Sequence, residues 1–392
     1  MPWPFTRRSP ESISKETKET RETTSSPSAR FAFRLLRQLA STSSSNVFFS
    51  PSSLMLCLTL VHELASGETR QSMAQALEIG DLDASQHAAE IALLKSAFRP
   101  REDAELTFAN AVWLSKRVQI ADELAAKLRG LYESELATLD FGGTDAVQTI
   151  NQWVDTGTRG KISKIVSQLS PLTALVATNA VYFKGVWVRP FEPQSTQNHP
   201  FTTATRTKRW PAMRQSGMYS YYEDRQLQMA ALPYKGYLSM YVVLPSAGSS
   251  MGEFPQRVSS GSWESWIAKS KLMEGTIQLP RFRVDYDAQL ESALSALGME
   301  RAFDENRAEF QAIRTDQPPV WIDQVIHRAM AEVNEAGTEA AAVTAVTMIC
   351  RSAKSPRPER RFSLVVDRPF LVVIRDDDTR TILFMGWIAD PQ

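Results

Sequence analysis

Residues 338–348 alternate in a way that fits a strand with one uncharged face. One set of alternate positions holds Thr338, Ala340, Ala342, Thr344, Val346 and Met348, and the other holds Glu339, Ala341, Val343, Ala345 and Thr347. Side chains on a strand point to opposite faces in turn, so the first set could lie on a packed core without burying an ion. The same letters also suit an alanine-rich helix that the Val/Thr run weakens, and propensity alone leaves both open.

The residues that follow decide between these alternatives. Ser355, Pro356 and Pro358 break any regular element, which leaves Arg351–Ser352 on an exposed, flexible loop. Gly337 can act as a hinge, and the residues from there to Ser352 could extend over roughly 45 Å. Trypsin-like proteases accept a basic side chain in an acidic specificity pocket, so the bond after Arg351 is a good substrate. The bond after Lys354 is a poorer second cleavage site, because Pro356 follows closely.

Composition excludes several classes of protein. The 392 residues include 44 basic and 44 acidic side chains, so nothing supports a general attraction to nucleic acid or membrane surfaces. The four histidines belong to no HExxH motif, and there is no GxSxG elbow or phosphate-binding glycine loop. The two cysteines form no zinc motif. We therefore expect no catalytic residue, cofactor or metal. Cys57 is predicted to be a core thiol and His327 a hydrogen-bonded core histidine.

The first 29 residues are rich in Ser, Thr, Glu, Lys and Arg and are predicted to be a disordered tail. Arg7 and Arg8 have no apolar stretch behind them, so no signal peptide is visible. On sequence alone this favours the cytoplasm. The longest apolar run, near residues 54–61, is too short to span a bilayer.

The rest of the chain mixes helices and strands without a βαβ repeat, which predicts an α+β fold. Helices are expected at residues 31–39, from Pro51 to a stop at Gly67, at 145–162, and within 286–299, where Leu290, Leu294 and Leu297 form an apolar stripe that Gly298 ends. Strands are expected at residues 107–114, 175–183, 238–245 and in two or three segments after 362, with a charged turn at Asp376–Asp378.

Two basic clusters have two interpretations each, a solvated surface or a weak polyanion contact. The first interleaves Arg206, Lys208, Arg209 and Arg214 with Trp210, and the second is RSAKSPRPERR at 351–361.

Six motifs, in order, resemble the serpins over residues from about 30 to 392. They are NVFFSPSSL, FANAVWL, INQWVDTGTRGKI, TNAVYFKGVWVRPF, EVNEAGTEAAA and DRPFLVVIRD with ILFMGWIADP. The resemblance implies a single domain of three β-sheets and about nine helices, with an exposed reactive-centre loop at about 335–361. In inhibitory members a protease cleaves the loop, and the loop then inserts as a new central strand and traps the acyl-enzyme.

The resemblance also implies roles for individual residues. Seventeen residues counted from Glu335, the family's usual spacing, end on Arg351, so the reactive bond is expected at Arg351–Ser352. The implied hinge comprises Glu335, Gly337, Thr338, Glu339, Ala340, Ala341 and Ala342. The polar cluster implied beneath the central sheet comprises Ser50, Ser53, Asn179 and His327, and Trp187 matches the residue near the insertion point.

These features predict a monomeric, single-turnover inhibitor that forms a covalent complex with a trypsin-like serine protease. The alternative is a non-inhibitory carrier or chaperone-like serpin, although the hinge lacks the charged or bulky residues typical of such members. Three features depart from the family pattern. The stretch after the reactive bond is longer and more basic, Cys350 precedes Arg351 as a small side chain or a redox-sensitive one, and no secretory signal is seen although most members are extracellular.

Overall fold

The computed structural model describes residues 25–143, 145–248, 252–315, 320–338 and 361–392. Nine α-helices lie within this part of the chain. They are α2 (Pro27–Thr42), α3 (Pro51–Leu64), α4 (Gly67–Ala76), α5 (Ala84–Ala97), α6 (Asp122–Tyr132), α7 (Ala146–Gly157), α8 (Phe254–Arg257), α9 (Ser260–Lys269) and α10 (Glu291–Leu294). Short helical turns cover Pro193–Ser195, Ser295–Met299 and Glu300–Phe303.

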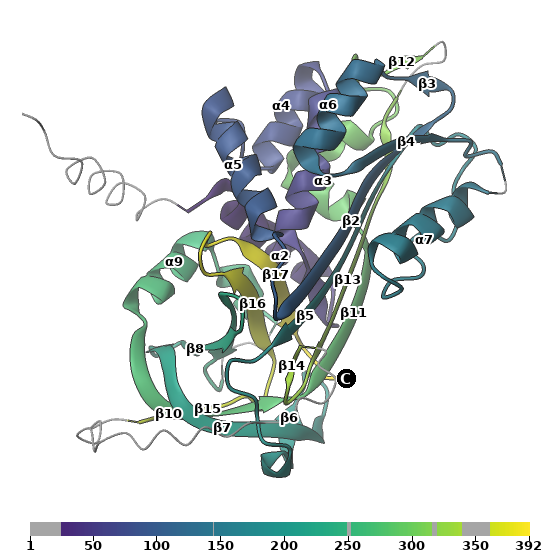
Figure 1. The fold of residues 1–392 in the computed structure, drawn as a ribbon. Coiled ribbons are helices and arrows are strands. Elements are labelled where there is room, and N and C mark those ends of the chain that lie inside the picture. The colour runs from purple at the N-terminus through teal and green to yellow at the C-terminus, as the bar shows by residue number, and fades with distance from the viewer. Residues whose placement is uncertain (1–24, 144, 249–251, 316–319, 339–360) are drawn as a thin grey trace, which may run out of the picture.

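A six-stranded sheet forms one wall of the molecule (Figure 1). Its strands, in spatial order, are β11 (Phe282–Gln289), β13 (Ile322–Val333), β14 (Gly337–Thr338), β5 (Leu175–Val186), β2 (Ala104–Ser115) and β4 (Glu135–Leu139). Strands β13 and β5 run parallel, and each has an antiparallel neighbour on its other side, β11 and β2 respectively.

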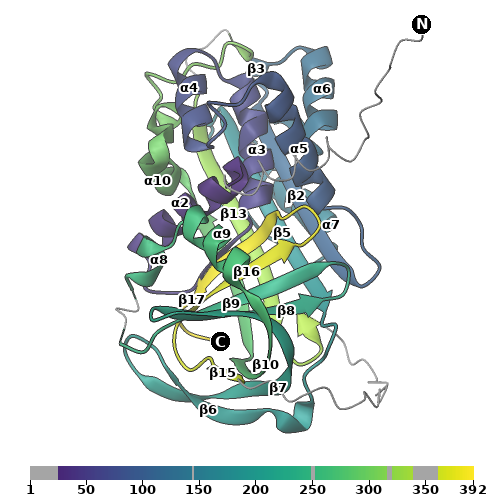
Figure 2. The same cartoon turned by 90° about the vertical axis from the view of Figure 1, so that its left-hand side faces the viewer.

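A nine-stranded sheet lies in front of it and below it in the view of Figure 2. Its strands are β1 (Val47–Phe49), β17 (Ile382–Ile388), β16 (Phe370–Asp376), β9 (Leu238–Pro245), β8 (Leu227–Tyr234), β7 (Thr207–Glu223), β10 (Lys271–Pro280) and β15 (Phe362–Val365), with β6 (Gln197–Thr202) paired to β7. A third, two-stranded sheet joins β3 (Val118–Gln119) to β12 (Arg314–Thr315). The expected α+β fold with three sheets and about nine helices is confirmed.

Helix α3 is the centre of the main core. Every residue from Pro51 to His62 is buried, because the helix packs on β2 and β5 on one side and on β17 on the other. A helix that is apolar all round belongs in such an interior. The thiol of Cys57 is 1% exposed, so its prediction as a core residue is confirmed. None of the described helices has the length and apolar character needed to cross a membrane.

Helix α7 covers the outer face of the same sheet (Figure 1). Its Ile150 and Val154 pack with Ala109 of β2 and Ala180 of β5 in a second, separate apolar cluster. Gly157 comes so close that a Cβ there would lie 2.9 Å from the Cβ of Ala109. The two central strands are therefore buried on both faces.

One predicted helix end is corrected by the structure. The helix expected to stop at Gly67 ends at Leu64, and Gly67 instead begins α4 with φ +53°. The left-handed glycine begins the next helix instead of ending this one. The stripe of Leu290, Leu294 and Leu297 lies in α10 and the helical turn that follows, where Gly298 has φ +112°, and Tyr286–Gln289 before it belong to β11.

Candidate functional site

The candidate site is the place in the six-stranded sheet where a short additional strand, β14, begins between two longer strands. The two residues of β14 lie between β13 and β5, where Thr338 pairs with Val333 on one side and with Gly185 on the other. Further along the sheet β13 and β5 pair directly with each other, from Met330–Tyr182 to Ile322–Leu175, and leave no space for a strand between them. The sheet thus contains the first two residues of an additional central strand (Figure 1).

A tight turn connects β13 to β14. The amide of Asn334 donates to the carbonyl oxygen of Gly337 at 2.8 Å, and the side-chain oxygen of Asn334 accepts from the amide of Ala336 at 3.1 Å. Gly337 is required by close approach, since a Cβ there would lie 1.9 Å from the carbonyl oxygen of Gly185. Only glycine allows the chain to re-enter the sheet at this point.

Glu335, the first residue of the predicted hinge, is fixed by side chains from two connections, Arg281 between β10 and β11 and Thr196 before β6. Nε of Arg281 donates to its carboxylate at 2.7 Å, and the hydroxyl of Thr196 donates to the same oxygen. Burial raises the pKa of Glu335, but the hydrogen bonds from Arg281 and Thr196 outweigh it and hold the pKa below its usual value. The carboxylate therefore stays charged and tied to the body of the protein.

Trp187 and Tyr234 form the floor beneath the turn. Their rings stack with centroids 4.0 Å apart and planes 9° apart. The indole N–H of Trp187 donates to the carbonyl oxygen of Asn334 at 3.0 Å, and its backbone N–H donates to the carbonyl oxygen of Ala336 at 3.1 Å. The hydroxyls of Tyr234 and Thr338 bond to each other, and Thr338 is fully buried. Trp187 thus holds the turn that leads into β14.

A buried polar cluster joins β13 and β5 further along these strands, away from β14. Nδ1 of His327 on β13 lies 2.6 Å from Oδ1 of Asn179 on β5, and Nδ2 of Asn179 donates to the Ser53 hydroxyl at 2.7 Å. The amide of Ser50 donates to Nε2 of His327 at 3.3 Å. Because Nε2 accepts, Nδ1 carries the proton and donates to Asn179. The structure therefore brings together all four residues of the predicted polar cluster.

Burial keeps this cluster uncharged. His327 is 0% exposed, and desolvation lowers its pKa to about 3. Sequence position explains why the side chains meet, because His327 lies directly opposite Asn179 in the register of β13 and β5. Ser50 and Ser53 reach the same place as the N-cap and first turn of α3, where the Ser50 hydroxyl accepts from the Ser53 amide.

Asn110 completes the cluster and was missed in the sequence. It lies on β2 opposite Asn179, and its Oδ1 accepts hydrogen bonds from Ser53 at 2.9 Å and from Asn179. Its Nδ2 donates to the backbone oxygen of Ser53 at 3.2 Å. The available signal was an asparagine in the middle of an apolar strand, matched by Asn179 in the next one. Arg281, Thr196 and Tyr234 were also missed, and no local pattern marks them.

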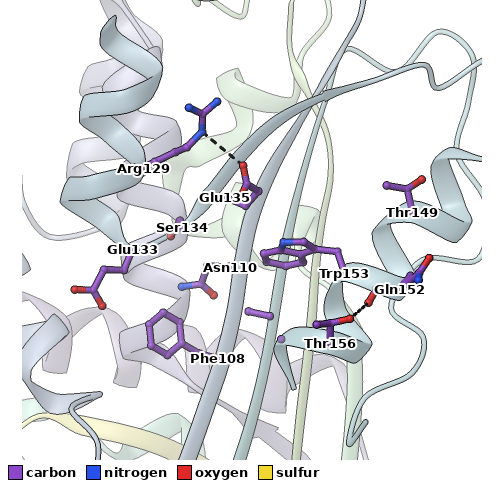
Figure 3. Close-up of a pocket in the computed structure, with 12 residues that line it drawn as sticks. Phe108, Asn110, Arg129, Glu133, Ser134, Glu135, Thr149, Gln152, Trp153 and Thr156 are labelled. Carbon is purple, nitrogen blue, oxygen red and sulfur yellow. Dashed lines mark hydrogen bonds and ion pairs between the residues drawn. The ribbon is translucent and has the colours of Figure 1, made fainter. Parts of the chain in front are cut away.

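A hollow of about 620 Å³ lies beside this cluster, between β2, the α6–β4 connection and α7 (Figure 3). Asn110 and Phe108 are at its base, Trp153 of α7 is on one side, and the ion pair of Arg129 with Glu135, 3.5 Å long, is on the other. The described residues of its lining include no histidine or cysteine that could pair with Ser134 as a base or nucleophile. Among the described residues, no group of His, Cys, Asp and Glu is placed to hold a metal ion.

The remaining predicted site residues lie outside the described part of the chain. These are Glu339 to Ala342, Cys350, Arg351, Ser352 and Lys354. The chain returns at Arg361, whose guanidinium pairs with Glu274 at 2.7 Å, and then enters the nine-stranded sheet as β15. The described chain therefore stops at Thr338 in one sheet and resumes at Arg361 next to another.

The first basic cluster carries less free charge than its sequence suggests. Lys208 and Arg206 both pair with Asp390, and the Lys208 ammonium also lies 4.1 Å from the ring centroid of Trp210. Arg209 and Arg214 are exposed. Two of the four cations, Lys208 and Arg206, therefore have a carboxylate partner on the protein itself.

The fold and this site define a class of protein in which a short strand begins between two parallel strands of the main sheet, and the chain next enters a second sheet as β15. The family model described as Serpin (serine protease inhibitor) matches residues 26–391. The chain belongs to the serpin family. Members of the family are mostly protease inhibitors rather than enzymes and generally partner with serine proteases.

Curated relatives cover most of the chain. A serpin-like protein of Thermococcus kodakarensis is 35% identical over 92% of this chain and 84% of its own length. Serpin B8 of Homo sapiens is 34% identical, over 92% of this chain and 97% of its own length. A serine protease inhibitor of Rattus norvegicus is 30% identical, over 97% of this chain and 92% of its own length.

Solved structures agree. Native tengpin, a thermophilic serpin, aligns with a TM-score of 0.84 at 25% identity, over 93% of both chains. Thyroxine-binding globulin in complex with thyroxine aligns with a TM-score of 0.82 at 27% identity, over 94% of this chain and 99% of its own. The family fold thus supports proteins named for inhibition and a protein named for ligand binding.

Proposed function

We propose that the protein is a single-turnover inhibitor of trypsin-like serine proteases, cleaved after Arg351. The protease forms an acyl-enzyme at that residue, and the loop released from Ser352 inserts between β5 and β13. Hydrolysis of the ester needs an aligned base and oxyanion hole, so displacement of the protease stalls deacylation. Each inhibitor molecule is used once. Its active state persists because its conversion to a more stable form is slow, not because it is the form of lowest free energy.

The observation that carries the proposal is the register of β14. Continuing its pairing would place Ala340 opposite Phe183 and Ala331, and Ala342 opposite Val181 and Ala329. Directly opposite residues share a face, so these small side chains would enter the buried inner face that Thr338 already occupies. Neither alanine would bring a charge into the core.

The same register gives the polar cluster a role. Continued insertion would bring Thr344 opposite both Asn179 and His327. The entering strand would break the direct bond between these side chains, and the threonine hydroxyl would offer a donor and an acceptor in its place. Insertion would then leave no buried polar group of the cluster unpaired, which would otherwise cost about 1–3 kcal/mol.

The test is to mix the protein with trypsin and separate the products on a denaturing gel. We expect a covalent complex whose inhibitor fragment ends at Arg351 by mass spectrometry. Arg351→Ala should abolish the complex, and Lys354→Ala should leave it unchanged. Cleavage without a complex would reject inhibition. In that case the thermal midpoint before and after cleavage separates a substrate that inserts its loop from a carrier-type serpin that does not, since insertion raises the midpoint greatly.

A further inference from the structure

A pocket of about 520 Å³ lies among the helices, at the end of the molecule away from β14 (Figure 1). The C-terminal part of α3 and helices α4, α5 and α6 surround it. Pockets of this size commonly hold small molecules. It shares no lining residue with the hinge or the polar cluster, so it is independent of the proposed inhibition.

Three buried polar atoms in the lining have no hydrogen bond within the described part of the chain. They are the hydroxyl of Tyr132, Nδ1 of His62 and Nε2 of His87. Tyr132 is 0% exposed and His62 6%, so neither side chain is solvated at the surface. Nδ1 of His62 has a longer contact, 3.6 Å, with the Glu63 carboxylate. Buried polar groups are nearly always paired, so the Tyr132 hydroxyl and Nε2 of His87 indicate a missing partner.

Among the described residues, the charges of the pocket leave one cation free. Glu63 pairs with Arg70 at 3.1 Å and faces Nδ1 of His62 at 3.6 Å. The contact with His62, opposed by burial and aided by Arg70, lowers the pKa of Glu63 to about 2, so this carboxylate is charged and compensated. Lys127 has no carboxylate partner in the described part of the chain.

The hydroxyl of Tyr132 can act as a donor. Burial and then the nearby charge of Glu63 raise its pKa, so it keeps its proton. The apolar part of the lining would contact a hydrocarbon body. Its members are Ala74, Ile79, Leu82, Ile91, Leu124, Leu128 and Leu131.

We propose that this pocket binds a small organic carboxylate with an apolar body. The carboxylate accepts hydrogen bonds from Tyr132 and His87 and pairs with Lys127, while the hydrocarbon part lies on the leucine and isoleucine side chains. A neutral alcohol of the same length would lack the charge that Lys127 recognises. A cation would be repelled by Lys127 and Arg70 and find Glu63 already paired.

The experiment is a calorimetric titration of the full chain with octanoate, with 1-octanol as the uncharged probe. We expect saturable binding of octanoate at one site and binding of 1-octanol at least about tenfold weaker, the loss expected for a hydrogen-bonded charge. Tyr132→Phe and Lys127→Gln should each weaken octanoate binding roughly tenfold. Tyr237→Phe, on an exposed ring outside the pocket, is the matched control and should change nothing.

The unliganded variants supply a second measurement. Because the Tyr132 hydroxyl makes no hydrogen bond of ordinary length among the described residues and only faces the Glu63 carboxylate, Tyr132→Phe should change the thermal midpoint of the free protein little. A lowered midpoint without octanoate binding would mean that the hydroxyl serves an internal bond, and the proposal would be wrong. Equal binding of 1-octanol, or octanoate binding unaffected by both variants, would also overturn it.

Discussion

His327 and Asn179 are joined by a hydrogen bond of 2.6 Å between Nδ1 and Oδ1, across the line where β13 meets β5. This is the line that an inserted strand must open. The bond is buried, and each side chain also makes a hydrogen bond to the start of α3. His327 accepts from the Ser50 amide, and Asn179 donates to the Ser53 hydroxyl. It therefore connects the two halves of the sheet to α3 and holds the strand position closed.

Removal of this bond should destabilise the uncleaved protein. His327→Ala leaves Oδ1 of Asn179 without that donor and creates a cavity in a fully buried place, so we expect a loss of about 2–4 kcal/mol. The measurement is the thermal midpoint at a fixed scan rate. His199→Ala, on β6, is the control and should shift it little, and an unchanged midpoint for His327→Ala would contradict a closing role.

The same histidine should make stability depend on pH. Its pKa is about 3 in the folded protein, against an ordinary value of 6.5. Between these values the unfolded chain binds a proton that the folded one refuses, so stability falls as pH falls below about 6.5, by up to about 1.4 kcal/mol per pH unit. Midpoints of wild type and His327→Ala between pH 4.5 and 7 test this.

The difference between the two proteins isolates His327. His87 also has a lowered pKa, but both proteins retain it. Glu63 is also retained by both, so the stability that its depressed pKa loses as pH approaches its ordinary value of 4.5 cancels in the difference. The advantage of wild type should shrink as pH falls, and parallel profiles would show that His327 is protonated in the folded state.

Strand periodicity and the family motifs predicted much of the fold from sequence, and the reason is local. The strands expected at 107–114, 175–183 and 238–245 lie within β2, β5 and β9, because long apolar runs bounded by breakers have few other ways to be buried. The failure at Gly67 is equally physical. A glycine after a helix often ends it, but here Gly67 adopts φ +53° and begins the next helix, so the helix predicted to reach Gly67 ends at Leu64.

The candidate site was only partly readable. His327 and Asn179 were found through the family resemblance, and no rule of periodicity places them opposite each other. Asn110 was missed because a single asparagine in an apolar strand has no chemistry until its neighbour across the sheet is known. Arg281 and Thr196 meet Glu335 from 54 and 139 residues away, so only tertiary structure reveals the pairing.

The ion pair of Arg281 with Glu335 should hold the start of the hinge against the body of the protein. Arg281→Ala leaves a carboxylate whose side chain is 11% exposed without its cationic partner, which should cost about 1–3 kcal/mol. We expect a lower thermal midpoint for the uncleaved protein and faster complex formation with trypsin, because β14 is held less firmly. Arg283→Ala, an exposed neighbour on β11, is the control. A variant with the wild-type midpoint and rate would show that the ion pair holds nothing.

The register of β14 predicts different results for charges on adjacent hinge residues. Ala340→Lys should block insertion, because the ammonium would face Phe183 and Ala331, which are 0% and 1% exposed, and burying it unpaired costs several kcal/mol. Glu339→Lys should be tolerated, because position 339 would lie on the outer face opposite Lys184 and Glu332, which are only partly buried.

The gel assay with trypsin distinguishes the two variants, and both keep the proposed cleavage site at Arg351–Ser352. Ala340→Lys should give mainly cleaved protein, since the acyl-enzyme is hydrolysed before the loop can enter, and Glu339→Lys should keep most of the covalent complex. The contrast depends only on which face each residue meets. If both variants trap trypsin equally well, the loop does not continue in the register that Gly337 and Thr338 begin, and trapping by insertion between β5 and β13 is wrong.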